Sequence, residues 1–380
     1  MRIAIDYSSA VNQRAGIGRL VRSQVKALAE IDHENQYLLL HARPNPGATV
    51  EAPSAPNFAR REIRLRERWV TIAWHRAQVP LAADWLTGRV DLFHSPDFVL
   101  PPVRRARTIL TVHDLAFLLR PECAESKLRA YLEQVVPRSV NRADYVIADS
   151  ENTRTDLVVL LGVDPDRITV VPGGVDPRFR PVNDPLQLAR ARERLGVGDA
   201  PFVVALGVLE PRKNLPRLMD AFAIAKSRGR IPRHKLVLAG GKGWLVEGIL
   251  EHHQRSPYQG DILLPGFVAD DLLPAVYSAA DVLAFPSLYE GFGLPILEAM
   301  ACGTPVVSSR SSCLPEVAEG AALMVDPEDA DGIATELERA ILDGPLRAEL
   351  RALGLERSRG YTWGRAAHRL LDVYRRVYAA

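Results

Sequence analysis

Short apolar stretches rich in valine, isoleucine and leucine recur along the whole chain and are bounded by turn residues. Most are apolar at successive positions, as strands are when helices cover both faces of a parallel sheet. Helical stretches separate many of them, and this alternation predicts a doubly wound α/β fold. The predicted strands lie at 2–6, 37–41, 91–95, 108–113, 145–149 and 168–172, and then at 202–207, 236–240, 262–265, 282–286, 305–308 and 322–326; clear helices lie at 18–30, 127–142 and 215–228.

One stretch, from Pro172 to Pro181, breaks this rhythm with turn residues and little periodicity. About half of the predicted strands lie on each side of it, and 380 residues exceed the usual size of a single core. We therefore expect two Rossmann-like domains, 1–176 and 177–361, which face each other across a cleft. The amphipathic segment 362–380 predicts a C-terminal helix that returns to pack on the N-terminal domain. Ligands of such sheets bind at the carboxyl ends of the strands.

Composition and charge narrow the function classes. The net charge of +2 gives no general case for binding nucleic acid. Three cysteines without metal-ligand spacing are read as reduced thiols. The N-terminus lacks the apolar core of a signal peptide, and no uncharged apolar run approaches the ~20 residues that span a bilayer. We expect a cytoplasmic protein.

The most informative motif follows the predicted strand at 282–286. A glycine-containing turn leads to Pro295, which fits the first position of a helix. The amides of Gly293, Leu294 and Ile296 are then predicted to be free to hold an anion. Glu298 lies one turn further along, where a carboxylate can accept hydrogen bonds from ribose hydroxyls. Glu290 lies in the turn itself, where it would face the group beyond the phosphates. Either glutamate alone would be a solvated or dipole-stabilising residue; their combination with the glycines and proline favours a ligand site.

Together with residues 301–307, this Glu-x7-Glu motif resembles the signature of family 4 retaining glycosyltransferases of GT-B fold, and the resemblance covers essentially the whole chain. It implies an enzyme that uses a nucleotide-diphosphate sugar as donor. It also implies that Glu298 binds the ribose and that Glu290 contacts the donor sugar. The backbone around Phe292, Gly293 and Leu294 is then expected to meet the sugar and phosphate.

Other segments of the second domain agree with this resemblance. Arg212 and Lys213 follow the strand at 202–207, and fixed cations beside a diphosphate would stabilise it as it leaves. The family has such a basic pair here. Gly241 lies in a glycine loop that has two interpretations, a tight turn or a loop near the nucleotide. Val268 resembles the position whose backbone meets the edge of the base.

Three features of the first domain also match the family. Gly16 and Gly18 open a helix in a loop that, by resemblance, contacts the donor phosphates and the acceptor; they do not form a dinucleotide fingerprint. His113 ends a buried strand, where the family has a histidine beside the donor sugar. Asp114 has three open interpretations: it orients His113, binds an acceptor hydroxyl, or caps the next helix.

The resemblance implies transfer with retention of the anomeric configuration, through an oxocarbenium-like transition state. Front-face attack and double displacement both remain open. We expect His113, Glu290, Arg212 and Lys213 to serve the chemistry. No Asp-x-Asp motif stands at a strand end, so we expect no obligatory metal ion or other cofactor.

Residues 94–97, 111–117 and 120–122 resemble the mannosyltransferase-like branch that builds bacterial surface polysaccharides. This implies GDP-mannose as donor and a glycan or lipid-linked glycan as acceptor, with UDP- or other nucleotide sugars as alternatives. Arginines between 60 and 68, followed by Trp69, Ile72 and Trp74, are interpreted as a solvated helix face; the alternative is a surface resting on the inner face of the membrane. A nucleotide-sugar epimerase of the same fold is the rival enzyme. An NAD-dependent dehydrogenase would need a glycine fingerprint that is missing.

Overall fold

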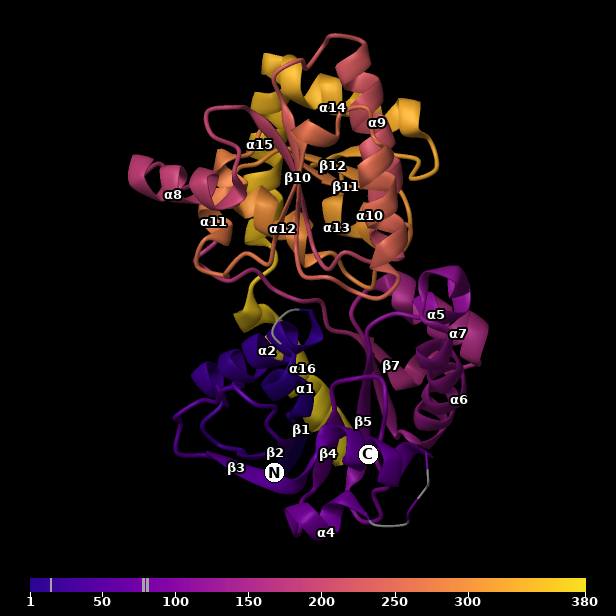
Figure 1. Cartoon of the computed structure of the whole chain (residues 1–380). Coiled ribbons are helices and arrows are strands. Elements are labelled where there is room, and N and C mark those ends of the chain that lie inside the picture. The colour runs from indigo at the N-terminus through magenta and orange to yellow at the C-terminus, as the bar shows by residue number, and fades with distance from the viewer. Residues whose placement is uncertain (14–15, 77–78, 80–81) are drawn as a thin grey trace. The chain divides into compact units, whose positions relative to one another are not determined.

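The computed structural model describes residues 1–13, 16–76, 79 and 82–380. Its contacts divide the chain into two compact α/β units (Figure 1). Unit 1 consists of Met1–Leu115, Ala130–Gly174 and Thr362–Ala380, and unit 2 consists of Ala116–Arg129 and Val175–Tyr361. The sequence analysis placed residues 116–129 in the N-terminal domain, whereas the contacts group them with unit 2.

Unit 1 is built on a seven-stranded sheet in the order β3-β2-β1-β4-β5-β6-β7. Every neighbouring pair in it is parallel. The strand order reverses between β1 and β4, the kind of position where ligands of doubly wound sheets bind. The strands are β1 (Arg2–Asp6), β2 (Gln36–Arg43), β3 (Phe58–Arg66), β4 (Leu92–Ser95), β5 (Arg107–Val112), β6 (Tyr145–Ala148) and β7 (Ile168–Val170).

The edge strand β3 corrects the interpretation of this arginine-rich stretch as a helix face. It pairs in parallel with β2, from Phe58 opposite Tyr37 to Arg66 opposite Arg43. Within β3 only Ile63 is buried. An edge strand that exposes most of its side chains needs no apolar run, and charged edge residues discourage pairing with other chains. The expected signal of a strand was therefore missing.

Helices cover the sheet of unit 1, and the C-terminal helix α16 (Trp363–Ala379) packs against α2 (Ile17–Ile31). Buried residues of both helices, among them Leu28 and Leu371, join β1 and β2 in one hydrophobic core. The remaining helices attached to this part of the chain are α1 (Ser8–Asn12), α3 (Glu67–Thr71), α4 (Ala83–Thr87), α6 (Ser126–Arg142) and α7 (Glu151–Leu161), with α5 (Ala116–Leu119) and the start of α6 grouped with unit 2.

A buried polar contact fixes α16 to the sheet. The ring of His94 in β4 bonds the Tyr374 hydroxyl through Nδ1 at 2.8 Å and the Thr111 hydroxyl through Nε2 at 2.8 Å. Burial lowers the pKa of His94 to about 3, so the ring is neutral. A neutral imidazole has one donor and one acceptor nitrogen, and both have a partner here.

Unit 2 has a six-stranded sheet in the order β10-β9-β8-β11-β12-β13, again parallel throughout. Side chains alternate between its two cores: Phe202 and Val204 lie in one, Val203 and Ala205 in the other. Among the described helices of the chain, none is both long and apolar enough to cross a membrane. The elements are β8 (Phe202–Leu206), β9 (Lys235–Ala239), β10 (Ile262–Gly266), β11 (Val282–Phe285), β12 (Val306–Ser309), β13 (Leu323–Val325), α8 (Pro185–Leu195), α9 (Leu215–Ser227), α10 (Val246–Arg255), α11 (Leu273–Ala279), α12 (Leu294–Ala301), α13 (Leu314–Ala318), α14 (Ala330–Leu342) and α15 (Gly344–Arg359).

The order of this second sheet reverses between β8 and β11. The loops that leave the carboxyl ends of these two neighbouring strands are Gly207–Asn214 and Pro286–Gly293. They contain the basic pair and the first glutamate of the Glu-x7-Glu motif. The topology therefore brings both motifs to the edge of the sheet where ligands bind in this class of fold.

Candidate active site

The loop after β11 ends in a conformation that requires glycine. Gly293 has φ of +102° and precedes α12, with Pro295 in the first turn. A Cβ at this position would lie 2.9 Å from Cδ2 of Leu314. Among the described residues, the backbone N–H groups of Gly293 and Leu294 have no hydrogen-bond partner, as predicted. The expectation for Ile296 is wrong, because its N–H donates to the Gly293 carbonyl at 3.0 Å.

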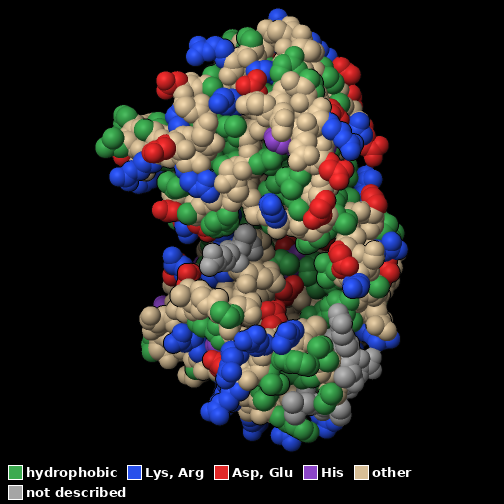
Figure 2. Space-filling view, in the orientation of Figure 1, with side chains coloured by type: hydrophobic (Ala, Val, Ile, Leu, Met, Phe, Trp, Pro, Cys, Tyr) green, Lys and Arg blue, Asp and Glu red, His purple; other side chains and the backbone are tan. Residues whose placement is uncertain are grey.

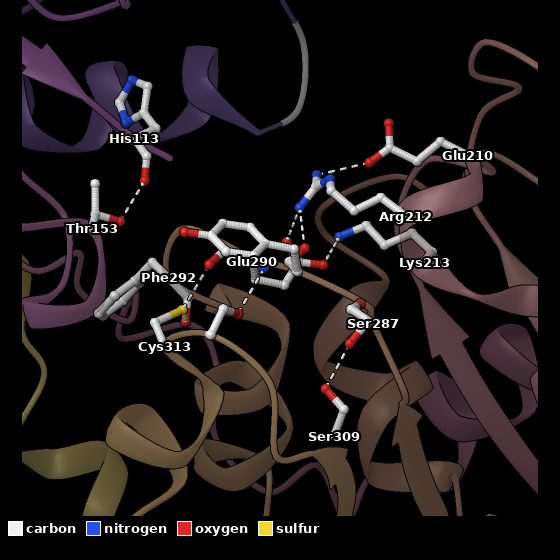
Figure 3. A network of polar contacts seen from close by, with 12 residues as sticks. His113, Thr153, Glu210, Arg212, Lys213, Ser287, Glu290, Phe292, Ser309 and Cys313 are labelled. Atoms are coloured by element: carbon white, nitrogen blue, oxygen red, sulfur yellow. Dashed lines mark hydrogen bonds and ion pairs between the residues drawn. The ribbon is translucent and has the colours of Figure 1, made fainter. Parts of the chain in front are cut away.

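Glu290 lies between the two cations that follow β8 (Figure 3). Its Oε2 accepts from Arg212 at 2.5 Å and its Oε1 from Lys213 at 2.6 Å. Burial by itself would raise the pKa of Glu290, but Arg212 and Lys213 outweigh it and lower the pKa to about 2. The structure thus brings Glu290 against two adjacent residues that precede it by 78 and 77 positions in the sequence.

A second carboxylate, which the sequence analysis missed, shares this cluster. Glu210 is buried, and its Oε1 accepts from Arg212 at 2.7 Å. Two carboxylates therefore balance the charges of Arg212 and Lys213. The only sequence signal was a glutamate two positions before an arginine in a strand-end loop, a spacing common on solvated loops.

Two neighbouring loops hold the backbone of 286–290. From the loop after β8, Arg212 donates to the Tyr289 carbonyl at 2.8 Å and Asn214 to the Pro286 carbonyl at 3.1 Å. From β12, the Ser309 hydroxyl donates to the Ser287 carbonyl at 2.6 Å. These contacts fix the position of Glu290 relative to the cations.

The loop after β12 adds two further contacts, from residues that the sequence did not single out. The Ser312 hydroxyl accepts from the Glu290 N–H at 2.9 Å. The buried Cys313 thiol lies 3.2 Å from the carbonyls of both Glu290 and Phe292, as a weak donor (Figure 3). Contacts of side chains with backbone groups leave no residue pattern that a sequence reading could detect.

Glu298 lies on α12 and is buried. Its Oε2 accepts from the hydroxyl of Tyr277, on α11, at 2.9 Å. Tyr277 is a second residue that the sequence analysis missed. The hydrogen bond fixes one oxygen of the carboxylate predicted to bind ribose.

The remaining predicted donor contacts of unit 2 have different surroundings. Phe292 is buried, with its ring 5.7 Å from that of Tyr361. The side chain of Val268 is in the core, whereas its backbone, just after β10, has no hydrogen-bond partner among the described residues. Gly241 lies in the loop after β9, and its carbonyl accepts from the Leu209 N–H at 2.9 Å. A Cβ added to Gly241 would meet nothing within 4 Å. Steric need therefore does not explain this glycine.

In unit 1, His113 follows β5 and is buried. Its Nδ1 bonds Oδ2 of Asp149 at 2.8 Å, and its Nε2 bonds the Pro96 carbonyl at 2.9 Å. Burial would lower the pKa of His113, but Asp149 and Asp97 outweigh it and raise the pKa to about 9. Because both partners are acceptors, the ring is an imidazolium with each nitrogen donating. Asp149, which directly follows the neighbouring strand β6, was not predicted as a site residue. Asp114, next to the histidine in the sequence, is half-buried.

Gly16 immediately precedes α2 and Gly18 lies in its first turn, and the two glycines have different structural reasons. Gly16 has φ of +58°, a left-handed conformation that favours glycine. Gly18 is buried, and a Cβ there would lie 2.1 Å from the Gln13 carbonyl oxygen. Close packing thus accounts for Gly18 without a ligand. Within the described residues, no group of three or more His, Cys, Asp or Glu side chains is placed to hold a metal ion.

Comparisons with known proteins agree with this architecture. Residues 189–357 match the family model "Glycosyl transferases group 1", and residues 14–179 match "Glycosyltransferase Family 4". The chain is 30% identical over 367 residues to the O-antigen chain mannosyltransferase B of Escherichia coli, covering 95% of this chain and 96% of that protein.

Solved structures show the same fold. Sucrose-phosphate synthase from Thermosynechococcus elongatus superposes with a TM-score of 0.78 at 24% identity, covering 100% of this chain and 99% of that one. Anabaena HepE in complex with UDP and glucose gives a TM-score of 0.74 at 19% identity, covering 98% and 99%. The two Rossmann-like units, the matched family models and the full-length relative lead to one conclusion: the chain is a glycosyltransferase of GT-B fold and belongs to family 4, the group 1 glycosyltransferases.

Proposed function

We propose that the enzyme transfers mannose from GDP-mannose, with retention of configuration, to a glycan or lipid-linked glycan during polysaccharide synthesis. The observation that carries the proposed donor site is the cluster of Glu290, Arg212 and Lys213. The same loop ends at Gly293 and Leu294, whose N–H groups have no partner within the described part of the chain. Similarity to an O-antigen chain mannosyltransferase over nearly the whole length supports the sugar and the pathway. A UDP- or other nucleotide sugar is the alternative donor.

The ion pairs suggest how a donor would bind. The diphosphate would take over Arg212 and Lys213 from Glu290, because it carries two negative charges where Glu290 carries one and can accept charge-assisted hydrogen bonds from both cations. Glu290, ionised at neutral pH, is then released to accept hydrogen bonds from the sugar. The amides of Gly293 and Leu294 would hold a phosphate oxygen at the start of α12. Glu298, oriented by Tyr277, would bind the ribose, and the backbone of Val268 the base.

In the transfer step the bond between the anomeric carbon and the phosphate oxygen breaks, and a bond to the acceptor oxygen forms. The acceptor proton passes to the leaving diphosphate in front-face attack; double displacement would first form a bond to the enzyme. Arg212 and Lys213 stabilise the negative charge that develops on the leaving group. His113 has no nitrogen left to accept a proton and therefore does not act as the base. The contact with the donor sugar that the family resemblance implies would require the Nε2–H group to exchange the Pro96 carbonyl for a sugar oxygen.

For the acceptor we propose a glycan carried on a lipid, which would place the enzyme at the inner face of the membrane. Chemical steps and binding of the donor need no metal ion in this proposal. Asp114 remains the candidate for orienting either His113 or the acceptor, and Gly16 and Gly241 the candidates for loop contacts with the donor.

This function can be tested in two steps. A panel of nucleotide sugars is screened for binding by thermal shift, and the products formed from those that bind are then analysed. GDP-mannose should raise the melting temperature most and, with a mannan-type acceptor, yield a mannosylated product. If a UDP-sugar raised the melting temperature most and its sugar was transferred, the donor would be that UDP-sugar and not GDP-mannose. Conversion of the donor into its epimer without an acceptor would instead identify an epimerase.

A further inference from the structure

The hydroxyl of Ser287, in the loop after β11, is a buried polar group that the proposed reaction does not use. The side chain is 1% exposed, and within the described part of the chain its oxygen has no hydrogen-bond partner. An alanine would fill nearly the same space, so packing does not account for the oxygen. Buried polar atoms are nearly always bonded, and an unbonded one destabilises the fold. The hydroxyl therefore points to a second state of the site, in which it has a partner.

The carboxylate of Glu290 lies close to this hydroxyl. Burial opposes the low pKa of Glu290, Arg212 and Lys213 lower the pKa to about 2, and the Ser287 hydroxyl adds a smaller lowering. Both carboxylate oxygens are already occupied, Oε2 by Arg212 at 2.5 Å and Oε1 by Lys213 at 2.6 Å. Figure 3 shows Ser287 beside Lys213 and Glu290. Before the donor binds, the hydroxyl is thus close to the carboxylate but not bonded to it.

The backbone of Ser287 is fixed, whereas its hydroxyl can turn. The Ser309 hydroxyl donates to the Ser287 carbonyl at 2.6 Å, and Asn214 donates to the preceding carbonyl, that of Pro286, at 3.1 Å. A serine hydroxyl rotates to suit its acceptor without any movement of the chain. Ser287 and Lys213 line the same hollow of about 10 Å³, roughly the room for one water molecule and too little for a sugar or a phosphate. The hydroxyl is therefore placed to act through Glu290 rather than to touch the donor.

Transfer of the cations to the donor changes what Glu290 needs. When the diphosphate takes Arg212 and Lys213, the carboxylate becomes a buried charge that has lost two donors, which is costly unless other hydrogen bonds replace them. The Glu290 N–H is held by Ser312, so the residue stays in place. We propose that Ser287 is a positioning residue, whose hydroxyl donates to the Glu290 carboxylate once the donor has taken the cations and so keeps it ionised and directed at the sugar. This inference rests on the proposed function, in which the cations pass from Glu290 to the diphosphate.

The test measures the affinity of the full-length enzyme for GDP by calorimetry. Ser287→Ala loses a hydrogen bond to a charged group only in the bound state, so the affinity for GDP should fall on the order of 10-fold. The melting temperature without nucleotide should stay at the wild-type value, because the hydroxyl has no bond to lose there among the described residues. GDP should raise the melting temperature of the variant less than that of the wild type. UDP is titrated in parallel and replaces GDP if the wild type binds it more tightly.

A double-mutant cycle shows whether the hydroxyl acts through Glu290. In Glu290→Ala there is no carboxylate to hold, so adding Ser287→Ala should change the affinity for GDP by less than about 2-fold. Ser287→Cys keeps a weak donor at the same position and should recover part of the affinity.

A matched control removes a serine hydroxyl that is equally buried. Ser308 lies on β12, is buried, and donates to the Ser309 carbonyl. The affinity of Ser308→Ala for GDP should match that of the wild type. Charged side chains of both signs cover the visible face of unit 2 (Figure 2), so all titrations are made at one ionic strength.

The outcomes separate this inference from the proposed function. Equal affinities of Ser287→Ala and the wild type, or an equal loss with and without the Glu290 carboxylate, would overturn the role of Ser287. A lower melting temperature without nucleotide, together with unchanged affinity, would show a structural role only and would overturn it too. Wild-type protein that binds GDP or UDP but transfers no sugar would refute the proposed function and leave the coupling between Ser287 and Glu290 standing. Wild-type protein that binds neither nucleotide would refute both.

Discussion

Glu290 has two successive tasks in the proposed reaction: it balances Arg212 and Lys213 before the donor binds, and it contacts the sugar afterwards. The variant Glu290→Gln removes the charge and keeps the size. Because the cations then lose a competitor for the diphosphate, GDP should bind several-fold more tightly in calorimetry. Turnover should fall by about 10²–10³-fold, the cost of one contact made in the transition state. Weaker binding of GDP, or turnover near that of the wild type, would contradict the exchange of ion pairs.

His113 gives the protein a pH dependence in the alkaline range. Its folded-state pKa of about 9 lies above the ordinary value of 6.5. The stabilisation is therefore complete below pH 6.5 and is lost as pH rises through 9. The difference corresponds to about 3 kcal/mol in the free energy of unfolding. Urea titrations from pH 6 to 10 should show this decline in the wild type.

The partner of His113 supplies the control for that measurement. In Asp149→Asn the main cause of the raised pKa is gone, so the alkaline decline should be much smaller and unfolding easier at neutral pH. If the wild type and Asp149→Asn lost the same stability as pH rises, the His113–Asp149 ion pair would not be the source of the alkaline decline.

Between elements, the loop after β11 depends on the loop after β12. Ser312→Ala removes the acceptor for the Glu290 N–H, and Cys313→Ala removes a weak donor to two carbonyls. Each change should raise the KM for the donor, by roughly 10-fold for Ser312→Ala, since an unsatisfied backbone group costs about 1–3 kcal/mol. Steady-state kinetics with varied donor would measure this.

Two further variants show whether the loop contacts matter. Cys313→Ser restores a donor at the same position and should recover most of the affinity for the donor substrate. Cys302→Ala removes an equally buried thiol at the end of α12, away from the loop, and should leave the KM unchanged. A shift in the KM for Cys302→Ala as large as that for Cys313→Ala would mean that general loosening of the core is responsible.

The strands that the sequence predicted are apolar runs, and most of them are buried on both faces, such as β8, where five successive residues are apolar and buried. β3 escaped notice because an edge strand can be built from arginines, with Ile63 as its buried contact. In the candidate site, the pattern of glycines and charged residues at strand ends predicted Glu290, Arg212 and Lys213. Glu210, Tyr277 and Asp149 were missed because each acts through a contact with a predicted residue: Arg212, Glu298 and His113, respectively. Such a contact leaves no local pattern in the sequence.

At the scale of the whole molecule, the charge of the site determines whether a metal ion is needed. Glu210 and Glu290 balance Arg212 and Lys213 before the donor binds, and the amides of Gly293 and Leu294 add partial positive charge. We expect transfer to continue unchanged after dialysis against EDTA. A loss of activity that Mg²⁺ or Mn²⁺ restores would show that the diphosphate needs a divalent ion and would contradict the proposal.

The central claim, retaining transfer from a nucleotide sugar, is tested most directly by the anomeric configuration of the product. The enzyme would be mixed with GDP-α-mannose and a soluble acceptor, and the new glycosidic signal followed by NMR from the first turnovers. We predict an α-linked mannose and a matching release of GDP. A β-linked product, or release of GDP without any glycoside, would contradict the account.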